Sequence, residues 1–456
     1  MSSLNASLAA ALSGLTAAQG ALQATSNNVA NVNTPGYSRQ VPVLATSDPI
    51  VVDPLTLGTG VTLRSIESIR DPILESRIQQ ETQTQGQLSA QASALSQLQV
   101  NFSSTSADIG TALSNFFDSV NQLATSPADL SLRQGVLTAA QNLASAFNRT
   151  SNNLTSQRTN LDSSVTQAVG QINQLSGQIA QLNGEIANLQ NVGENAGTFI
   201  DQRTQLIDQL SSLVDISVIP SNNSVTLTTA SGVALVAGQS SYQLSTHLDA
   251  SGVQHIFAQG SDITAKIVSG QLGGLLQARD QQIPGIQSQL DALASAVATA
   301  VNGVQTAGYD LNGDAGTNLF TPPPASGAGA ASALTVAISD PSLIAASSDG
   351  TVGNNANAEA LYALRNQAVV QGQSPTDFYS GIVFNVGNTA SDTNANQSAS
   401  ALVLQQLNSQ RASISGVSLD EEAANTMQYQ QAYAASAQVI SAINTMMQDV
   451  INMKTS

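Results

Sequence analysis

The feature that most restricts the fold is a regular hydrophobic seam at the start of the chain. Its side chains recur at alternating intervals of four and three residues, with Thr25 as the one polar member, which is typical of a helix packed against another helix. Pro35 disfavours a helical conformation of the residue before it, so we predict that the helix ends near Thr34. The seam consists of Leu4, Leu8, Ala11, Leu15, Ala18, Leu22, Thr25, Val29 and Val32.

A second seam with the same spacing lies near the other end of the sequence. Ser418 and Glu421 match a capping box, which predicts that a helix begins at Leu419. No charged residue occurs between Ala423 and Gln448, just as none precedes Arg39. This seam consists of Tyr429, Tyr433, Ser436, Ile440, Ile443, Met447 and Val450.

Two helices of this kind are not expected to be stable alone, because such helices gain most of their stability by burying an amphipathic face. Their other faces also lack the charges of a solvated helix. We therefore predict that the two ends pair with each other and with further copies of the chain, as a terminal coiled-coil assembly domain of residues 1–40 and 417–456. We hypothesise that they become ordered only during polymerisation. The alternative, a helix pair inside an ordinary monomeric bundle, leaves the missing surface charge unexplained.

The interior of the chain predicts a helical rod of residues 41–215 and 269–416. Nine seam positions keep the same spacing between Leu161 and Leu189, within a helical tract from Leu130 to Gln190 that would extend about 90 Å at 1.5 Å per residue. Ser374 is a candidate N-cap for a helix that begins at Pro375. Further helices are predicted over about residues 73–123, 199–213, 272–304, 358–370 and 375–411.

Residues 216–268 interrupt the rod with a different pattern. Short alternating or β-branched runs are separated there by turn residues such as Ser231 and Gly232, which predicts a small antiparallel β domain. A proline-containing linker comes later, and residues 334–338 are a candidate for one further strand. The predicted fold class is mainly α with a β insertion. The predicted strands cover residues 216–219, 225–229, 233–236, 242–245, 254–258 and 263–268.

The charge content excludes several classes of partner. Only 43 of the 456 residues are charged, or 9%, against about 25% in ordinary globular proteins, and the net charge is −17. The 13 basic residues are scattered, so we expect neither nucleic acid nor anionic lipid as a partner. No apolar run approaches the roughly 20 residues that span a bilayer, so we expect no membrane insertion.

Two further absences bear on where the protein acts. The chain has no cysteine, which removes disulfides and thiol chemistry. A secretory signal needs a basic leading segment, and the first charged residue is Arg39. If the protein leaves the cytoplasm, we expect another export route.

The histidines and one acidic loop do not indicate a catalytic or metal site. His247 and His255 are the only histidines, and exposed strand or loop histidines are far commoner than a base or a ligand pair. Asp310 opens a run that is similar to a calcium loop. Ala315 and Thr321 stand where such a loop needs Gly and Glu, so we predict a turn.

The remaining candidates for chemistry have simpler explanations. The acidic run Asp420, Glu421 and Glu422 suits the first turn of a helix, where carboxylates interact favourably with the helix dipole, better than a glycosidase acid pair. The glycines at 270, 273 and 274 lack the spacing and the lysine of a phosphate-binding loop. We therefore predict no catalytic residue, no metal site and no cofactor.

Both ends of the chain contain motifs that resemble those of bacterial flagellar axial proteins. The segment from Ser26 to Gln40 reads SNNVANVNTPGYSRQ, and its PGYSRQ part is similar to the FlgK family of hook-associated proteins. The segment from Gly416 to Asn425, GVSLDEEAAN, is similar to the C-terminal signature of that family, and Asp201-Gln202-Arg203 and residues 308–313 resemble its middle. The motif residues that we take from the resemblance are Asn31, Asn33, Thr34, Pro35, Gly36, Tyr37, Asp420, Glu421 and Glu422.

The resemblance implies a structural role rather than an enzymatic one. Subunits of this family are expected to assemble helically between hook and filament, with the terminal helices forming an inner coiled-coil tube. The implied partners are further copies of the chain, the hook protein on one side, and a second junction protein with the filament cap or flagellin on the other. The implied route is flagellar type III export with the chaperone FlgN at the C-terminal region.

Three other functions stay open at this point. A hook or distal rod protein shares the Asn-rich N-terminal signature but usually lacks the DEEA run and the long interior rod. A secreted peptidoglycan hydrolase would need an acid pair in a cleft, for which the sequence offers no candidate. A secreted adhesin that uses the β domain is the third alternative.

Overall fold

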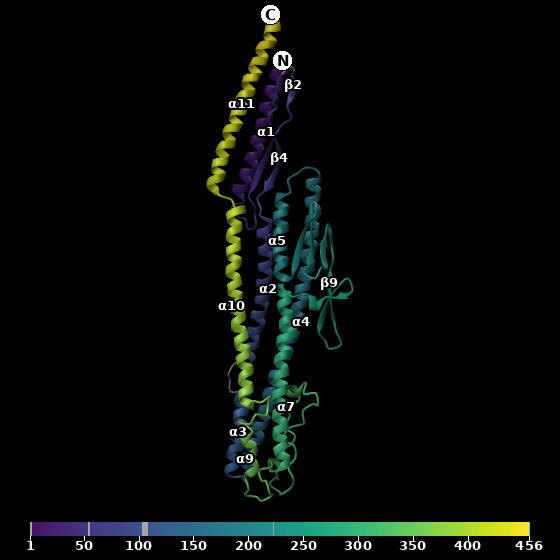
Figure 1. The fold of residues 1–456 in the computed structure, drawn as a ribbon, viewed down its shortest axis with the longest axis vertical. Helices are drawn as coiled ribbons and strands as arrows, with labels where there is room; N and C mark the ends of the chain where they lie inside the picture. The colour runs from purple at the N-terminus through teal and green to yellow at the C-terminus, as the bar shows by residue number, and fades with distance from the viewer. Residues whose placement is uncertain (1, 53–54, 103–107, 222, 456) are drawn as a thin grey trace.

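The computed structural model describes residues 2–52, 55–102, 108–221 and 223–455. The molecule is elongated, and both chain ends lie at the same end of it, beyond a long helical rod from which a β domain projects (Figure 1). The predicted fold class, mainly α with a β insertion, is confirmed. No helix in the described part of the chain combines the length and apolarity needed to cross a bilayer.

A terminal unit forms one end of the molecule. It consists of α1 (Ser2–Ala30), the strands β1 (Gln40–Thr46), β2 (Ile50–Val52), β3 (Leu55–Leu57) and β4 (Val61–Ser68), and α11 (Leu419–Thr455). The helix α1 runs antiparallel to α11 and also packs on the β1–β4 ladder (Figure 1). The two helices lie close together at Gly14, where an added Cβ atom would lie only 3.0 Å from Ser436 Oγ. The small residues at these two positions therefore allow the helices to pack closely.

The four strands of the terminal unit were not expected from the sequence. Residues 41–68 were assigned to the helical rod, whereas the structure pairs β1 with β4 from Gln40 opposite Ser68 to Thr46 opposite Val61, with a shift of register between Val43 and Leu44. In β4, half-buried and exposed side chains alternate from Val61 to Ser65, and the alternation is broken at Ile66. In β1 it is interrupted by Pro42, and the strand is supported by contact with α1, which a local pattern cannot indicate.

The rod is built around α4 (Leu130–Asn191), whose 62 residues span about 90 Å. The other main helices of the rod are α2 (Pro72–Asn101), α3 (Ile109–Thr125), α5 (Gly197–Leu213), α6 (Gly270–Gln277), α7 (Ile283–Ala307) and α10 (Pro375–Ser415). Short elements complete it: α8 (Ala330–Ala333), η3 (Pro341–Leu343) and α9 (Ala356–Ala363).

Two of the predicted rod helices are interrupted. The single helix predicted over residues 73–123 is divided into α2 and α3, and the Asp108 side chain caps α3 by accepting a hydrogen bond from Thr111 N. The helix predicted over residues 272–304 contains the π-helical turn η2 (Ala278–Gln282) between α6 and α7. This turn buries Arg279, which donates to Asp162 of α4 at 2.7 Å.

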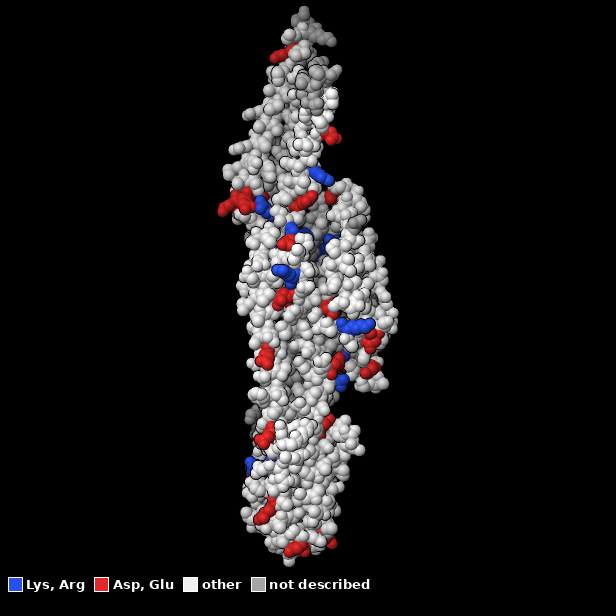
Figure 2. Space-filling model, in the orientation of Figure 1, with Lys and Arg blue, Asp and Glu red and all other residues white. Residues whose placement is uncertain are grey.

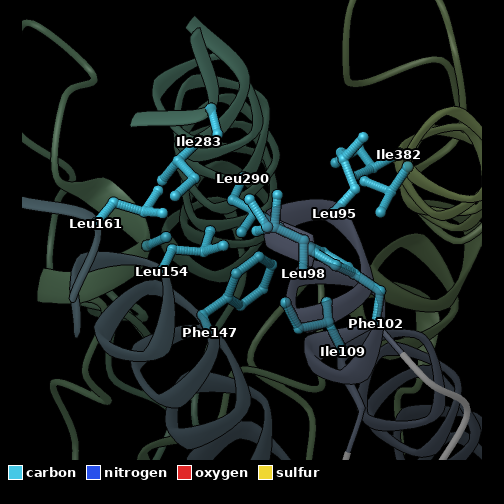
Figure 3. Packing of buried hydrophobic residues seen from close by; sticks show 14 of the residues in the cluster. Leu95, Leu98, Phe102, Ile109, Phe147, Leu154, Leu161, Ile283, Leu290 and Ile382 are labelled. Carbon is cyan, nitrogen blue, oxygen red and sulfur yellow. The ribbon is translucent and has the colours of Figure 1, made fainter. Parts of the chain in front are cut away.

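The apolar core runs along the rod. Side chains from α2, α3, α4, α7 and α10 meet in it, among them Leu98, Ile109, Phe147, Leu290 and Ile382 (Figure 3). All five are almost fully buried, so the periodic apolar positions of several helices fill one continuous interior.

The β domain contains two small antiparallel sheets on one side of α4. The first has the order β5 (Ile216–Ser221), β6 (Ser224–Thr229), β7 (Ala234–Ala237) and β8 (Ser240–Ser241). The second consists of β9 (Leu244–Leu248), β10 (Gln254–Ala258) and β11 (Ser261–Asp262). Asparagines of α4 hold both sheets, because Asn183 Nδ2 donates to Val225 O at 2.9 Å and Asn173 Nδ2 donates to Leu244 O at 2.8 Å.

Three strand predictions differ from the structure. In the strand predicted over residues 242–245, Tyr242 and Gln243 lie between β8 and β9, and only the last two residues belong to β9. Within the strand predicted over residues 263–268, residues Thr264–Lys266 form the 3₁₀ turn η1, because the Asp262 side chain accepts hydrogen bonds from both Thr264 N and Thr264 Oγ1. Residues 334–338 make only an isolated bridge between Val336 and Phe320. A strand therefore does not continue there.

The N-cap of α4 gives a first testable prediction. Asp129 accepts hydrogen bonds from Ser131 N at 2.7 Å and Leu132 N at 3.3 Å. Replacing it with Ala should lower the free energy of unfolding by about 1 kcal/mol, because two donors of the first helical turn lose their acceptor. Urea denaturation checks this, with Asp129→Asn as the control, since Asn caps nearly as well. Equal midpoints for the Ala and Asn variants would contradict the prediction.

Candidate assembly surfaces and the joint between the terminal unit and the rod

The predicted seams of the terminal helices are only partly buried within one chain. Ile443 is 3% exposed, whereas Val29, Tyr433 and Val450 are exposed. The small seam residues Ala11, Ala18 and Thr25 are buried. The larger seam residues that remain are half-buried: Leu4, Leu8, Leu15, Leu22, Val32, Tyr429, Ile440 and Met447. The fully buried face of α1 is formed mainly by alanines, including Ala21 and Ala24. The pairing of α1 with α11 therefore leaves many of the larger apolar side chains of both helices partly or fully exposed.

The uncovered apolar side chains are numerous. They are Leu12 and Val29 on α1, and Leu419, Met427, Tyr433, Val439, Met446, Val450, Ile451 and Met453 on α11. We call this set the exposed terminal surface. Few charged side chains accompany it on the visible face of the terminal helices (Figure 2). A surface of this kind is typical of a protein contact rather than of a solvated helix.

The Asn-rich motif that follows α1 folds back on the end of that helix. Asn28 is buried, and its side chain donates to Gln40 O and accepts from Gln40 N, both at 2.8 Å. Tyr37 Oη also donates to Asn28 Oδ1, at 2.9 Å. Gly36 has φ +78°, a conformation that favours glycine. One asparagine thereby fixes the turn that leads from α1 into β1.

The other N-terminal motif residues have lesser roles within one chain. Asn31 Nδ2 donates to Asn27 O at 3.0 Å, and Thr34 Oγ1 donates to Asn31 Oδ1 at 3.1 Å, so both side chains support the end of α1. Asn33 and Pro35 are exposed.

Arg39 connects the N-terminal motif to the C-terminal one. Its Nε lies 2.8 Å from Glu422 Oε1, its Nη1 lies 2.5 Å from Glu421 Oε2, and its backbone N donates to Ser415 O at 2.8 Å. The Glu422 side chain is 1% exposed, whereas Glu421 and Asp420 are exposed. From the sequence we assigned these acidic residues to the first turn of a helix, with Glu421 in a capping box, and to the family motif, and we did not predict Arg39 as their partner.

The middle motif joins the same cluster from the rod. The buried Asp201 of α5 forms an ion pair with Arg70 and accepts a hydrogen bond from Ser38 N at 3.3 Å. Arg70 Nε donates to Ser38 Oγ at 3.1 Å. Burial raises the pKa of Asp201, and the Arg70 charge and the Ser38 hydrogen bonds oppose that rise.

Together these residues form what we call the joint between the terminal unit and the rod. Burial, followed by the charges of Asp201 and Glu422, raises the pKa of Tyr37 to about 12. Tyr37 therefore stays neutral near pH 7 and keeps its hydrogen bond to Asn28. The fold thus brings three sequence-predicted motifs to one place, whereas the exposed terminal surface lies beyond it.

The candidates for chemistry remain separate from the joint. His247 and His255 are opposite each other on β9 and β10, and His255 Nδ1 lies 2.7 Å from Asp262 Oδ2. Asp310 Oδ1 accepts hydrogen bonds from Asn312 N and Asp314 N, which makes that loop a turn. The described residues contain no group of three or more His, Asp or Glu side chains arranged to hold a metal ion.

Comparison with known protein families gives flagellar matches in three segments of the chain. The family model described as the flagellar hook-associated protein FlgK helical domain matches residues 95–320. Residues 408–453 match the C-terminal model of the flagellar basal body rod FlgEFG proteins, and residues 8–37 match the flagella basal body rod protein model. The terminal segments are thus similar to several axial proteins, and the interior is similar to one family.

Relatives and a solved structure agree with these matches. Flagellar hook-associated protein 1 of Bacillus subtilis strain 168 is 31% identical, over 96% of this chain and 96% of its own length. Flagellar hook-associated protein 1 of Escherichia coli K12 is 28% identical, over 97% of this chain and 99% of its own. The fold is similar to that of the flagellar hook junction protein FlgK from Burkholderia pseudomallei, with a TM-score of 0.67, 20% identity, and coverage of 74% of this chain and all of that one.

Proposed function

This chain belongs to the flagellar hook-associated protein 1 family, and from that membership we propose that it is a structural subunit which self-assembles into the junction between the flagellar hook and filament. The observation that carries the proposal is the exposed terminal surface, which a solitary chain leaves in water. Burial of apolar area contributes about 25 cal/mol per Å², so copies of the chain that cover this surface gain stability.

The terminal helices are the proposed site of self-assembly. Within one chain α1 already packs on α11, β1 and β4, so the terminal unit has contacts of its own. The structure thus differs from the hypothesis that both ends become ordered only during polymerisation, because α1 and α11 are formed and packed together within one chain. What we propose for polymerisation is the burial of side chains that remain exposed, such as Met446 and Ile451. The terminal unit, with residues 40–68 added to the expected 1–40 and 417–456, is the proposed assembly domain, and residues 216–268 are the proposed β domain.

The partners follow from the position of a junction. We propose that the hook protein lies on one side and that a second junction protein, with the filament cap or flagellin, lies on the other. We also propose that the chain is secreted through the flagellar export apparatus and that FlgN covers its C-terminal region before assembly. The exposed methionines of α11 support the last step, because Met-rich apolar surfaces suit a partner that binds and is later released.

We propose no enzymatic activity. Burial in the joint accounts for the raised pKa values of Asp201 and Tyr37, and both side chains already have hydrogen-bond partners there. The alternative of a hook or distal rod protein is not favoured, because the match that covers residues 95–320 is to the FlgK helical domain.

Loss of the protein from its own bacterium tests the proposal. Cells that lack it should carry hooks without filaments and should release flagellin monomers into the medium, because the filament then has no base on which to grow. Electron micrographs of the cell surface and immunoblots of the medium measure both outcomes. Restoring the gene on a plasmid is the control. Normal filaments on the deletion strain would contradict a junction role.

A further inference from the structure

A groove of about 340 Å³ lies where the terminal unit meets the rod. Residues 31–32 and 35–38 of the N-terminal motif segment line one side of it. The rod contributes Glu75 from the first turn of α2, Asp208 from α5 and Arg411 from the last turns of α10. Residues 415–417, at the bend between α10 and α11, close the groove. Any change in the angle between the terminal unit and the rod therefore alters this groove.

The charges in the groove are unbalanced. Arg411 Nη1 lies 3.1 Å from Asp208 Oδ2 and 3.5 Å from Glu75 Oε2. One guanidinium therefore forms ion pairs with two carboxylates that come from different helices. These two groups, Glu75 from α2 and Arg411 from α10, are the charges that act on Asp208. The segment 31–38 adds Tyr37, which is neutral near pH 7, and α4 and α6 direct no charge at Asp208 within the described part of the chain. With both carboxylates ionised, the groove holds one excess negative charge.

Three buried acceptors in the groove also lack a hydrogen-bond donor. Asp208 Oδ1, Asn408 Oδ1 and Glu75 Oε2 are buried and accept no hydrogen bond in the described structure. Buried acceptors without donors are rare and costly in folded proteins. Protonation of Asp208 removes the excess negative charge and also provides one hydrogen-bond donor among these acceptors. Burial, reinforced by the Glu75 charge and opposed by Arg411, raises the pKa of Asp208 to about 6.

We propose that this groove is a pH-sensitive hinge, in which protonation of Asp208 tightens the contact of α5 with α10 beneath the terminal unit and ionisation loosens it. The closed groove favours the protonated carboxyl, whereas an opened groove returns Asp208 to water and to its ordinary pKa of 3.8. The closed state therefore binds more protons than the open state at pH values between these two pKa values. Closure is strongest in mild acid and weakens as the pH rises through this window.

Hydrogen exchange of the full-length monomer measures the opening. The opening equilibrium changes tenfold for each pH unit between the open-state pKa of 3.8 and the closed-state pKa of about 6. Because pH 5 lies about one unit below the closed-state pKa, exchange of residues 31–38 and 405–418 should be about tenfold faster at pH 8 than at pH 5, after correction for the intrinsic rate. Asp208→Asn, an uncharged side chain of the same shape, should remove this difference. Glu75→Gln should move its midpoint to lower pH, because the neighbouring negative charge is gone.

Asp215→Asn is the matched control. Burial raises the pKa of Asp215 to about 6 as well, but its Oδ2 accepts a hydrogen bond from Val268 N at the β domain, away from the groove. That variant should keep the tenfold difference at residues 31–38 and 405–418. The hinge is refuted if the wild-type segments exchange equally at both pH values, or if Asp208→Asn retains the difference. If Asp208→Asn does not fold, an unmoved midpoint in Glu75→Gln refutes it instead.

Discussion

Val439→Asp on α11 should abolish assembly, while Val403→Asp on α10 should leave assembly at the wild-type level. The two valines are matched, because Val439 is 47% exposed and Val403 is 48% exposed in a single chain. They differ in position, since only Val439 belongs to the exposed terminal surface. A carboxylate at an interface between copies would be buried without a partner, and the cost of burying an unpaired charge reaches several kcal/mol per subunit. Because every subunit carries the change, we expect no detectable junction.

The measurement separates assembly from folding and export. Both variants should keep the wild-type thermal melt as monomers, because neither side chain is in the core. Both should be recovered from the culture medium, whereas only Val403→Asp should be found on isolated hook–basal bodies and should restore motility. Incorporation of Val439→Asp at the wild-type level would show that the exposed terminal surface does not contact other copies.

Much of the rod could be predicted from the sequence because its helices are long and strongly periodic. The predicted tract from Leu130 to Gln190 differs from α4 by one residue, and α10 begins at Pro375 with Ser374 as its N-cap, as predicted. Long periodic segments average out the weak preference of each residue, so the pattern indicates both the type and the extent of the element. The division between α2 and α3 was missed, because apolar positions continue through Val100, Phe102 and Ile109.

The strands of the terminal unit were missed for a different reason. Residues 40–68 contain three prolines, and β1 and β4 pack against α1, a tertiary contact that the local pattern does not indicate. The π-helical turn at Ala278–Gln282 has no local signal either, since it is supported by the tertiary contacts of Arg279 with Asp162 and Gln254 O.

The motifs of the joint were found in the sequence, but their pairing was not. Arg39 and Glu422 are 383 positions apart, so only the topology of the chain brings them together. The one available signal was that Arg39 is the first charged residue of the chain, in a sequence with few charges. Such an isolated charge next to a motif indicates a specific partner, but it does not say which acidic residue that partner is.

The ion pair between Arg39 and Glu422 should hold α11 to the rest of the joint. Glu422 is 1% exposed, so Arg39→Ala would leave a buried carboxylate without its cation, and breaking a buried pair in this way costs about 3–5 kcal/mol. Glu421 is 59% exposed, so its contact with Arg39 adds little. Since α11 contacts the rest of the molecule mainly through α1, the loss should appear as local opening at the start of α11 and not as unfolding of the rod.

Hydrogen exchange of residues 419–426 measures that opening. With Arg39→Ala we expect at least a hundredfold faster exchange there, which corresponds to about 2.7 kcal/mol, and unchanged exchange in the core of α4. Arg365→Ala is the matched control, because Arg365 pairs with Asp118 at 2.7 Å but both side chains are substantially exposed, so its effect should stay below about 1 kcal/mol. Adding Glu422→Gln to Arg39→Ala should recover part of the loss, because the unpaired charge is then absent. If the double variant opens as readily as Arg39→Ala, or if Arg39→Ala exchanges like the wild type, the buried charge does not determine how α11 is held.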